Sequence, residues 1–116
     1  MSRELFSRRA EPPDSRLLVE PLPDPAGPTV LHLTGELDVR TVNLLCDTTV
    51  ALLEAGDRRM RLDLSRISWC DNASLYTILG LQHAVLTAGG HLGLTSVSWP
   101  VAQAIARNSL WQFLRR

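Results

Sequence analysis

The sequence predicts one α/β domain, a mixed β-sheet with helices packed mainly on one side. Three observations support this prediction. Strand-like segments alternate with helix-like ones over most of the chain, an order that implies parallel strand pairs joined by helical connections. Two strand-like segments come first, with no helix between them. The chain has 116 residues, of which 45% are hydrophobic and 21% charged, which is enough for one core and too little for two.

The N-terminal part of the chain divides into a tail, two strands and a proline-rich connection. Residues 1–15 are polar and charged, so we expect a flexible N-terminal tail before a domain that spans residues 16–116. Residues 16–20 and 29–34 are rich in β-formers and predict strands. Residues 21–28 hold four of the seven prolines, and we expect them neither to continue the first strand nor to begin a long helix.

The first long helix is expected over residues 38–55, after a turn at residues 35–38. Asp38 or Thr41 can supply its N-cap, and Gly56 suits its C-terminal end. Apolar residues recur there every three or four positions, which is typical of the buried face of a helix: Val42, Leu45, Cys46, Val50 and Leu53.

The second half of the chain repeats this alternation. Strands are predicted at residues 61–64 and 91–95, separated by a helix at residues 72–88 that ends at two glycines. The apolar positions of that helix are Leu75, Ile78, Leu79, Val85 and Leu86. A last helix begins near Pro100, because proline is tolerated in a first turn. Its inward face is expected to hold Val101, Ala104 and Ile105, and the residues expected to pack against the domain after it are Trp111, Phe113 and Leu114.

Composition argues against several classes of function. Twelve basic residues balance twelve acidic ones, so the chain lacks the excess positive charge from which nucleic-acid binders gain affinity. Cys46 and Cys70 show no metal-ligand spacing, and the chain has neither a glycine-rich phosphate loop nor a Ser-His-Asp arrangement. We therefore expect no catalytic residue, no metal and no cofactor. Because no apolar run suits a signal peptide or a membrane span, we expect a cytoplasmic protein without membrane or nucleic-acid partners.

Two segments lie where α/β proteins collect functional groups, at the end of a strand and the start of the next helix. They are residues 35–41 and 69–75. With the pieces around them they resemble the STAS domain family, which includes anti-sigma factor antagonists, over roughly residues 16–114. The pieces that carry the resemblance are Val30-Leu31-His32-Leu33-Thr34-Gly35-Glu36-Leu37-Asp38, Leu62-Asp63-Leu64-Ser65, Cys70-Asp71-Asn72-Ala73-Ser74-Leu75 and Ala88-Gly89-Gly90.

The resemblance implies a STAS fold and a regulator that binds another protein. In the family, the segment that corresponds to residues 71–75 reads Asp, Ser, Ser or Thr, Gly, Leu. The second hydroxyl residue of this segment accepts a phosphate from a partner kinase, which is usually the anti-sigma factor itself. The phosphate releases the antagonist from that partner. Here Asp71 and Leu75 match, but Asn72 replaces the first Ser, Ala73 the phosphoacceptor and Ser74 the Gly. Because Ala73 has no hydroxyl, phosphorylation at the family position is chemically impossible.

The resemblance therefore predicts a protein-binding regulator that docks a kinase-type anti-sigma factor or a related regulator. The residues expected to contact this partner are Gly35, Asp38, Asp71, Asn72, Ala73, Ser74 and Tyr76. Two alternatives stay open, phosphorylation at Ser74 as the switch and binding of a small ligand or nucleotide. One step along a helix turns a side chain by about 100°, which aims Ser74 away from the usual acceptor direction and favours a constitutive binder. The sequence is compatible with a monomer and with a homodimer.

Several of these residues also have purely structural explanations. Asp38 and Asp71 are good helix caps, and each can serve as a cap and as a partner contact. Asp63, within a strand motif, is expected to stabilise the fold as a hydrogen-bond acceptor. Cys70 is expected to be a packed core thiol rather than a reactive one, and a packing role for Tyr76 is as well supported as a binding role.

Overall fold

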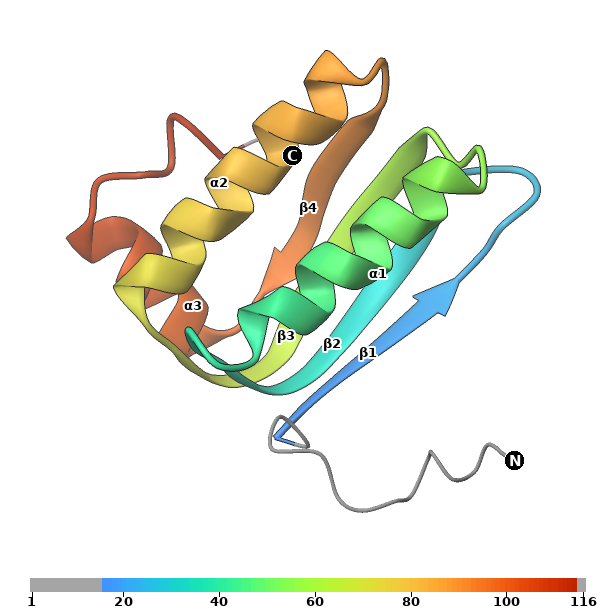
Figure 1. Cartoon of the computed structure of the whole chain (residues 1–116). Helices are drawn as coiled ribbons and strands as arrows, with labels where there is room; N and C mark the ends of the chain where they lie inside the picture. The colour runs from blue at the N-terminus through green and yellow to red at the C-terminus, as the bar shows by residue number, and fades with distance from the viewer. Residues whose placement is uncertain (1–15, 115–116) are drawn as a thin grey trace.

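The computed structural model describes residues 16–114, and the expected tail at residues 1–15 lies outside them. Within the described residues the chain forms four strands and three helices in the predicted order (Figure 1). These elements are β1 (Leu17–Leu22), β2 (Thr29–Leu37), α1 (Val42–Glu54), β3 (Arg59–Cys70), α2 (Asn72–Thr87), β4 (His91–Val97) and α3 (Trp99–Arg107). None of the described helices is both long and apolar enough to cross a membrane.

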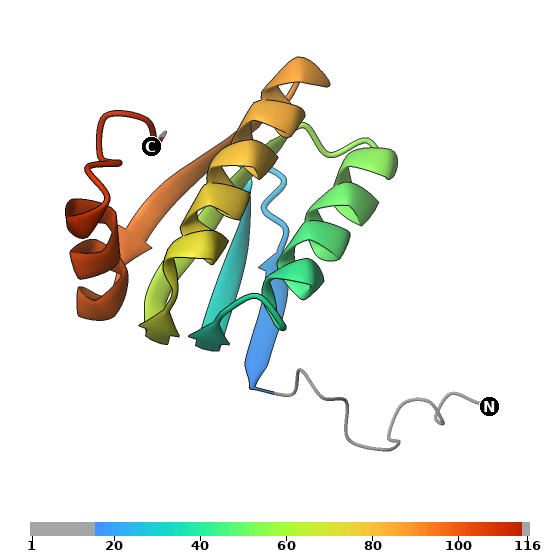
Figure 2. The ribbon, with the colours of Figure 1, turned by 60° about the vertical axis from the view of Figure 1, so that its left-hand side comes forward.

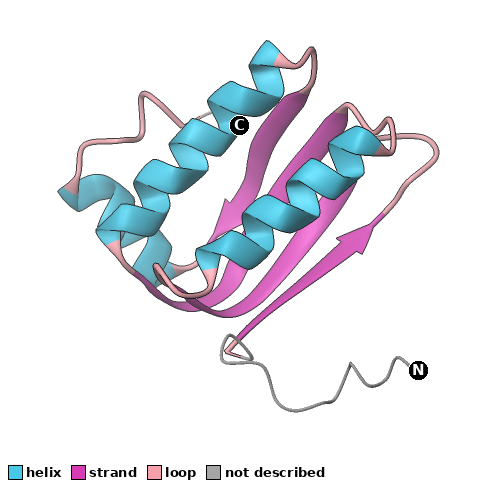
Figure 3. Cartoon of the chain, viewed as in Figure 1, coloured by secondary structure: helices cyan, strands magenta, loops and turns pink. Residues whose placement is uncertain are grey.

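The strands form one mixed sheet in the order β1-β2-β3-β4. β1 pairs antiparallel with β2, whereas β2, β3 and β4 are parallel. Helices α1 and α2 cover one face of the sheet, and α3 follows at its β4 side (Figures 2 and 3). The predicted mixed sheet with helices mainly on one side is confirmed. Because β2 and β3 are parallel, their C-terminal ends meet at one edge, and the antiparallel β1 begins there, with Leu17 opposite Gly35.

The core lies between the sheet and the two long helices. Leu31, Leu33 and Leu37 of β2 are each at most 1% exposed, since alternate residues of a strand face the same side. Leu45 of α1 and Ile78 of α2 meet them from the predicted helix faces and are equally buried. Burying one such side chain stabilises the fold by about 1.5–3 kcal/mol, so this layer fixes the positions of the strand ends.

β1 and β2 both continue through residues that often end a strand, so each extends further than predicted. β1 runs through Pro21, which lies opposite Leu31 in a strand at the edge of the sheet, where a missing N–H group is tolerated. β2 runs through residues 35–37, which were expected to form a turn. Gly35 pairs with Leu17 on one side and Ile67 on the other, because β1 and an unexpectedly long β3 extend far enough to reach it.

The buried faces of the helices are also narrower than predicted. Val50 of α1 and Leu86 of α2 are 45% and 41% exposed, so the expectation that they face the core is wrong. Polar neighbours take the buried positions, since each satisfies its hydrogen-bonding groups locally. Thr49 Oγ1 donates to the Leu45 carbonyl at 2.9 Å, and Gln82 Nε2 donates to the Leu92 carbonyl at 2.8 Å.

The segment after α3 packs only in part. Leu110 and Leu114 are buried, whereas Trp111 and Phe113 are 38% and 57% exposed. The expectation that this segment packs against the domain therefore holds for Leu114 and is wrong for Phe113. α3 itself begins as expected, with the Ser98 hydroxyl accepting from the Val101 N–H and Pro100 in the first turn.

Candidate functional site

The candidate site lies at the edge where β2 and β3 end and α2 begins. Leu37 and Cys70 are paired there as the last residues of their strands, and the Asp71 N–H donates to the Leu37 carbonyl at 3.1 Å. The loop after β2 therefore lies against the first turn of α2. We call this region, residues 38–41 and 69–76, the strand-end corner.

Asp71 joins the two halves of the strand-end corner. One carboxylate oxygen, Oδ1, accepts from the Ser74 N–H at 2.8 Å and so caps α2. The other, Oδ2, accepts from the Val39 N–H at 3.2 Å in the loop after β2. Both oxygens are thus used to hold backbone, and the predicted capping role of Asp71 is confirmed.

Asp38 is buried and holds the loop after β2 in shape. Its Oδ1 accepts from the backbone N–H groups of Arg40 at 2.8 Å and Thr41 at 3.2 Å, and its Oδ2 accepts from the Arg16 guanidinium at 3.2 Å. Burial opposes the ionisation of Asp38, but these hydrogen bonds and the positive charge of Arg16 lower the pKa of the carboxyl below its usual value. Arg16 also bonds Glu36 at 3.0 Å, so the start of β1 is tied to the same loop.

The cap assignment for α1 is more complex than predicted. Thr41 occupies the N-cap position without a side-chain cap bond, because its hydroxyl instead donates to the Glu36 carbonyl at 2.8 Å. Asp38 lies before the helix and binds the loop backbone. The expected helix start at Asp38 is therefore wrong, and α1 begins at Val42.

The exposed surface of the strand-end corner is mostly apolar. Val39, Trp69 and Tyr76 are 60%, 56% and 52% exposed, although their side chains are large and hydrophobic. The Arg40 side chain, 72% exposed, lies at the limit of ion-pairing distance from Asp38, 4.0 Å. Both corner carboxylates are engaged internally, so the groups left at the surface are hydrophobic and basic. The exposed polar and small neighbours on the first turn of α2 are Asn72 and Ala73.

Ser74 faces the interior. Its side chain is fully buried, and its hydroxyl has no hydrogen-bond partner among the described residues. Ala73, one position earlier, is exposed. The roughly 100° turn between neighbouring helix positions thus places the methyl group of Ala73 toward solvent and the hydroxyl of Ser74 toward the core.

Two further residues fix the geometry of the strand-end corner. Gly35 has φ +121°, and a Cβ there would lie 1.9 Å from the Arg16 carbonyl oxygen, so the close approach of β1 to β2 requires glycine. Asn72 accepts a hydrogen bond from Asn108 at 2.9 Å, which links α2 to the end of α3. Asn72 is the first residue of α2 and does not cap it, because Asp71 fills that role.

Cys70 is a buried thiol beneath the strand-end corner. Burial and the negative charge of Asp71 raise the pKa of the Cys70 thiol to about 12. A thiol with such a pKa is almost entirely protonated at neutral pH, so it is a poor nucleophile. The expectation of a packed core thiol agrees with this environment.

A family model described as "Mlab, STAS domain" matches residues 23–115, most of the chain. The chain belongs to the STAS family. Among solved structures, the anti-sigma factor antagonist SpoIIAA in its unphosphorylated form matches with a TM-score of 0.67 and 18% identity, over 83% of this chain and 84% of that one. The Bacillus cell fate determinant SpoIIAA in the phosphorylated form matches with a TM-score of 0.63 and 18% identity, over 83% and 87%. At this identity, the matches establish the fold.

A third match shows the same fold within a longer chain. The structure named Mglu has a TM-score of 0.59 and 18% identity, over 80% of this chain but only 24% of that one. The strand-end corner contains the predicted contact residues except Gly35, although Asp38 and Ser74 are buried in it. It adds three exposed side chains that were not among the predicted contacts: Val39, Arg40 and Trp69.

Proposed function

We propose that this STAS domain is a regulator that acts in the cytoplasm by binding a protein through the strand-end corner. Its expected partner is a kinase-type anti-sigma factor or a related regulator, as for an anti-sigma factor antagonist. The observation that carries this proposal is the exposure of Val39, Trp69 and Tyr76 around a helix N-terminus that Asp71 holds rigid. Exposed aromatic side chains on a fixed backbone are typical of surfaces that bind other proteins.

The arrangement of the polar groups supports binding rather than catalysis. Asp38 and Asp71, the residues available for acid or base chemistry, each bind two backbone N–H groups. The Cys70 thiol is buried with a pKa of about 12. These groups fix the shape of the surface, whereas the apolar side chains and Arg40 are the ones expected to contact the partner. We infer that the partner presents an apolar patch with a nearby carboxylate to meet Arg40.

The same geometry supports a binder that escapes phosphorylation. Ala73 stands at the position that the family uses as phosphoacceptor, and it has no hydroxyl. Ser74 is fully buried, so a kinase could reach its hydroxyl only after the first turn of α2 opens. SpoIIAA has been solved in unphosphorylated and phosphorylated forms, and we propose that this chain is held in the binding-competent state by its sequence.

Binding measurements with a matched pair of variants test the proposed surface. Kinase-type anti-sigma factors from the same organism are purified and titrated calorimetrically with the wild type, Ala73→Glu and Ala84→Glu. Both alanines are exposed on α2, but Ala84 lies at the far end of the helix. We expect one of these proteins to bind the wild type and Ala84→Glu alike, and Ala73→Glu at least about ten-fold more weakly. Equal weakening by both variants, or no binding by any of these proteins, contradicts the proposal.

Phosphorylation is tested on the partner found in this way. The protein is incubated with that partner and labelled ATP, and the label is located by peptide mass spectrometry. We expect no phosphate on Ser74 in the wild type and phosphate on residue 73 in Ala73→Ser. Label on Ser74 of the wild type would instead support the phosphorylation-switched alternative.

A further inference from the structure

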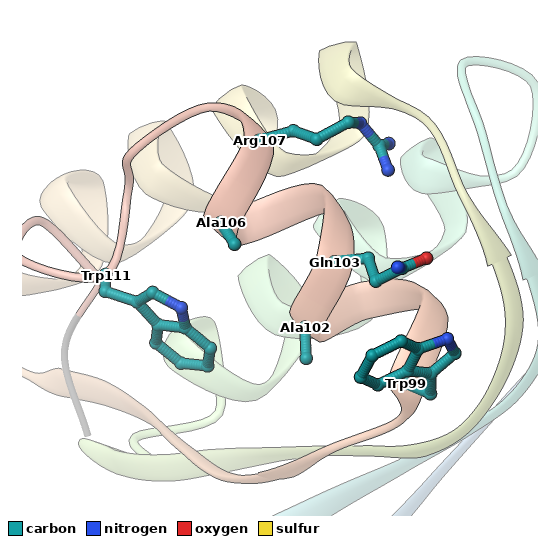
Figure 4. Close-up of a pocket in the computed structure, with 6 residues that line it drawn as sticks. All are labelled: Trp99, Ala102, Gln103, Ala106, Arg107 and Trp111. Carbon is teal, nitrogen blue, oxygen red and sulfur yellow. The ribbon is translucent and has the colours of Figure 1, made fainter.

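The outer face of α3 carries an apolar surface that the proposed function does not use. Trp99 is 72% exposed, the most exposed large hydrophobic side chain among the described residues. Successive helix positions turn by about 100°, so Trp99, Gln103 and Arg107 lie on one face with two small side chains, Ala102 and Ala106 (Figure 4). The opposite face holds the buried residues of α3: Val101, Ala104 and Ile105.

This face is hollowed. A depression of about 630 Å³ is lined by Trp99, Ala102, Gln103, Ala106, Arg107 and Trp111. Figure 4 shows the two indole rings on either side of the small alanine side chains. Small side chains between two bulky aromatic ones form a groove into which another large side chain fits.

We propose that a second copy of this chain occupies the groove, through antiparallel packing of α3 on α3 about Gln103. Trp99 and Arg107 each lie four residues from Gln103, on opposite sides. At about 1.5 Å per residue, each is about 6 Å along the helix axis from that centre. An antiparallel pair centred on Gln103 therefore brings Trp99 of each copy level with Arg107 of the other, over Ala106. The interface is self-complementary, as a twofold dimer requires.

The Arg107 side chain favours this occupant through aromatic stacking, since two copies of this face carry charge of the same sign and do not attract each other by charge. Residues 98–114 contain no acidic side chain, and Arg107 has no ion pair among the described residues. A guanidinium group stacks favourably on the face of an indole ring, so Trp99 of the second copy supplies the partner that Arg107 lacks on its own chain. The pairing repeats twice by symmetry, and each contact buries a tryptophan.

Analytical ultracentrifugation of the full chain between about 5 and 500 µM tests the dimer, since one pair of short helices predicts a weak interface. We expect a reversible monomer–dimer equilibrium. Trp99→Ala should weaken it at least about ten-fold. Trp69→Ala is the matched control, because Trp69 is also exposed but lies at the strand-end corner, and it should leave dimerisation unchanged. A monomer at all concentrations, or equal weakening by both variants, overturns the proposal.

Cysteine cross-linking tests the register of the pair independently. In a Cys46→Ser background, Gln103→Cys places a thiol at the proposed twofold axis, whereas Glu54→Cys places one on the exposed end of α1. We expect rapid disulfide-linked dimers from Gln103→Cys and slow ones from Glu54→Cys. Equal rates would overturn the antiparallel packing of α3. Neither experiment involves the anti-sigma factor, so failure here leaves the proposed function standing.

Discussion

Carboxylates organise both the strand-end corner and the open face of the sheet, but the side chains exposed in the two regions differ in polarity. On the open face, away from α1 and α2, His32 of β2 and Ser96 of β4 flank Asp63 of β3 in register. Asp63 accepts from both of them at 2.9 Å, and from the Ser65 N–H at 3.0 Å and its hydroxyl at 2.6 Å. The predicted role of Asp63 as a structural acceptor is confirmed.

The comparison shows that one fold can use carboxylates in two ways, which leave different side chains exposed. On the open face the polar side chains remain at the surface around their carboxylate. At the strand-end corner the carboxylates of Asp38 and Asp71 bind backbone, and hydrophobic side chains stay exposed. Water solvates the first arrangement well, whereas the second leaves apolar area that a partner can cover. Substitutions in the two regions should therefore differ in what they change.

The largest effect should come from Gly35, where β1 approaches the strand-end corner. Gly35→Ala requires a Cβ 1.9 Å from the Arg16 carbonyl oxygen at φ +121°, so β1 must move away from β2, which disturbs the Arg16 ion pairs with Glu36 and Asp38. We expect a loss on the order of 3 kcal/mol in the free energy of unfolding, measured by urea denaturation.

Gly80→Ala provides the control for this change. Gly80 lies within α2, and no atom approaches the position of an added Cβ within 4 Å. Alanine is the better helix former, so this variant should be stabilised by up to about 1 kcal/mol. If both glycine variants lose stability equally, the close approach of β1 does not explain the glycine at position 35.

The second effect belongs to the open face and depends on pH. Burial alone would raise the pKa of Asp63, but hydrogen bonds from Ser65, Ser96 and His32 lower it to about 2, from 3.8. A carboxyl with a lowered folded-state pKa stabilises the fold above its unfolded pKa, and this contribution is lost as pH falls from about 4 to about 2. Over that pH range, the unfolding free energy of the wild type should fall by on the order of 2 kcal/mol more than that of Asp63→Asn.

Chemical denaturation at pH values from about 5 to about 2 measures this difference. The amide that Asp63→Asn introduces keeps the shape of the side chain but does not titrate, so the unfolding free energy of this variant should fall less steeply with acid. Parallel curves for the two proteins would show that folding does not lower the pKa of Asp63. The test concerns the open face alone, because the strand-end corner is intact in both proteins.

The third-largest change in stability is expected at the strand-end corner. Asp71→Ala removes the cap of α2 and leaves the Val39 N–H without its acceptor. We expect a loss of about 1–2 kcal/mol in unfolding free energy and faster hydrogen exchange at Val39 and Ser74. Asn72→Ala is the comparison variant, since it removes only the exposed bond to Asn108 and should cost less. A larger loss from Asn72→Ala would contradict the role assigned to Asp71.

The sequence predicts most of this architecture because its periodic patterns report local structure and burial. All seven elements appear in order, the cap at Asp71 is found where Asp precedes a helical pattern, and the last helix begins near Pro100 as predicted. The prediction fails where a distant pairing decides the outcome. Pro21 and Gly35 usually end strands, but here a neighbouring strand pairs with each of them, and no local pattern shows how far that neighbour extends.

The candidate site likewise has features that the sequence predicts and features that it does not. Motif and position identify Asp71, Ala73 and the helix N-terminus, but they do not show that both corner carboxylates turn inward. That depends on Arg16 and Val39, which approach from elsewhere in the chain and complete the hydrogen bonds. A sequence motif therefore predicts where the candidate site lies, whereas the side chains exposed there are known only from the assembled strands.

The smallest effect on stability should accompany a large effect on binding. Tyr76 is 52% exposed on α2 near Ala73, so Tyr76→Ala should change the unfolding free energy by no more than about 0.5 kcal/mol. The same variant should bind the partner at least about ten-fold more weakly, because a tyrosine at the centre of an interface contributes strongly. Phe113→Ala, a similarly exposed aromatic outside the strand-end corner, should alter neither quantity. If Tyr76→Ala keeps full affinity while Phe113→Ala loses it, the binding surface lies beside the C-terminal segment, and the contrast between the two regions does not mark the site.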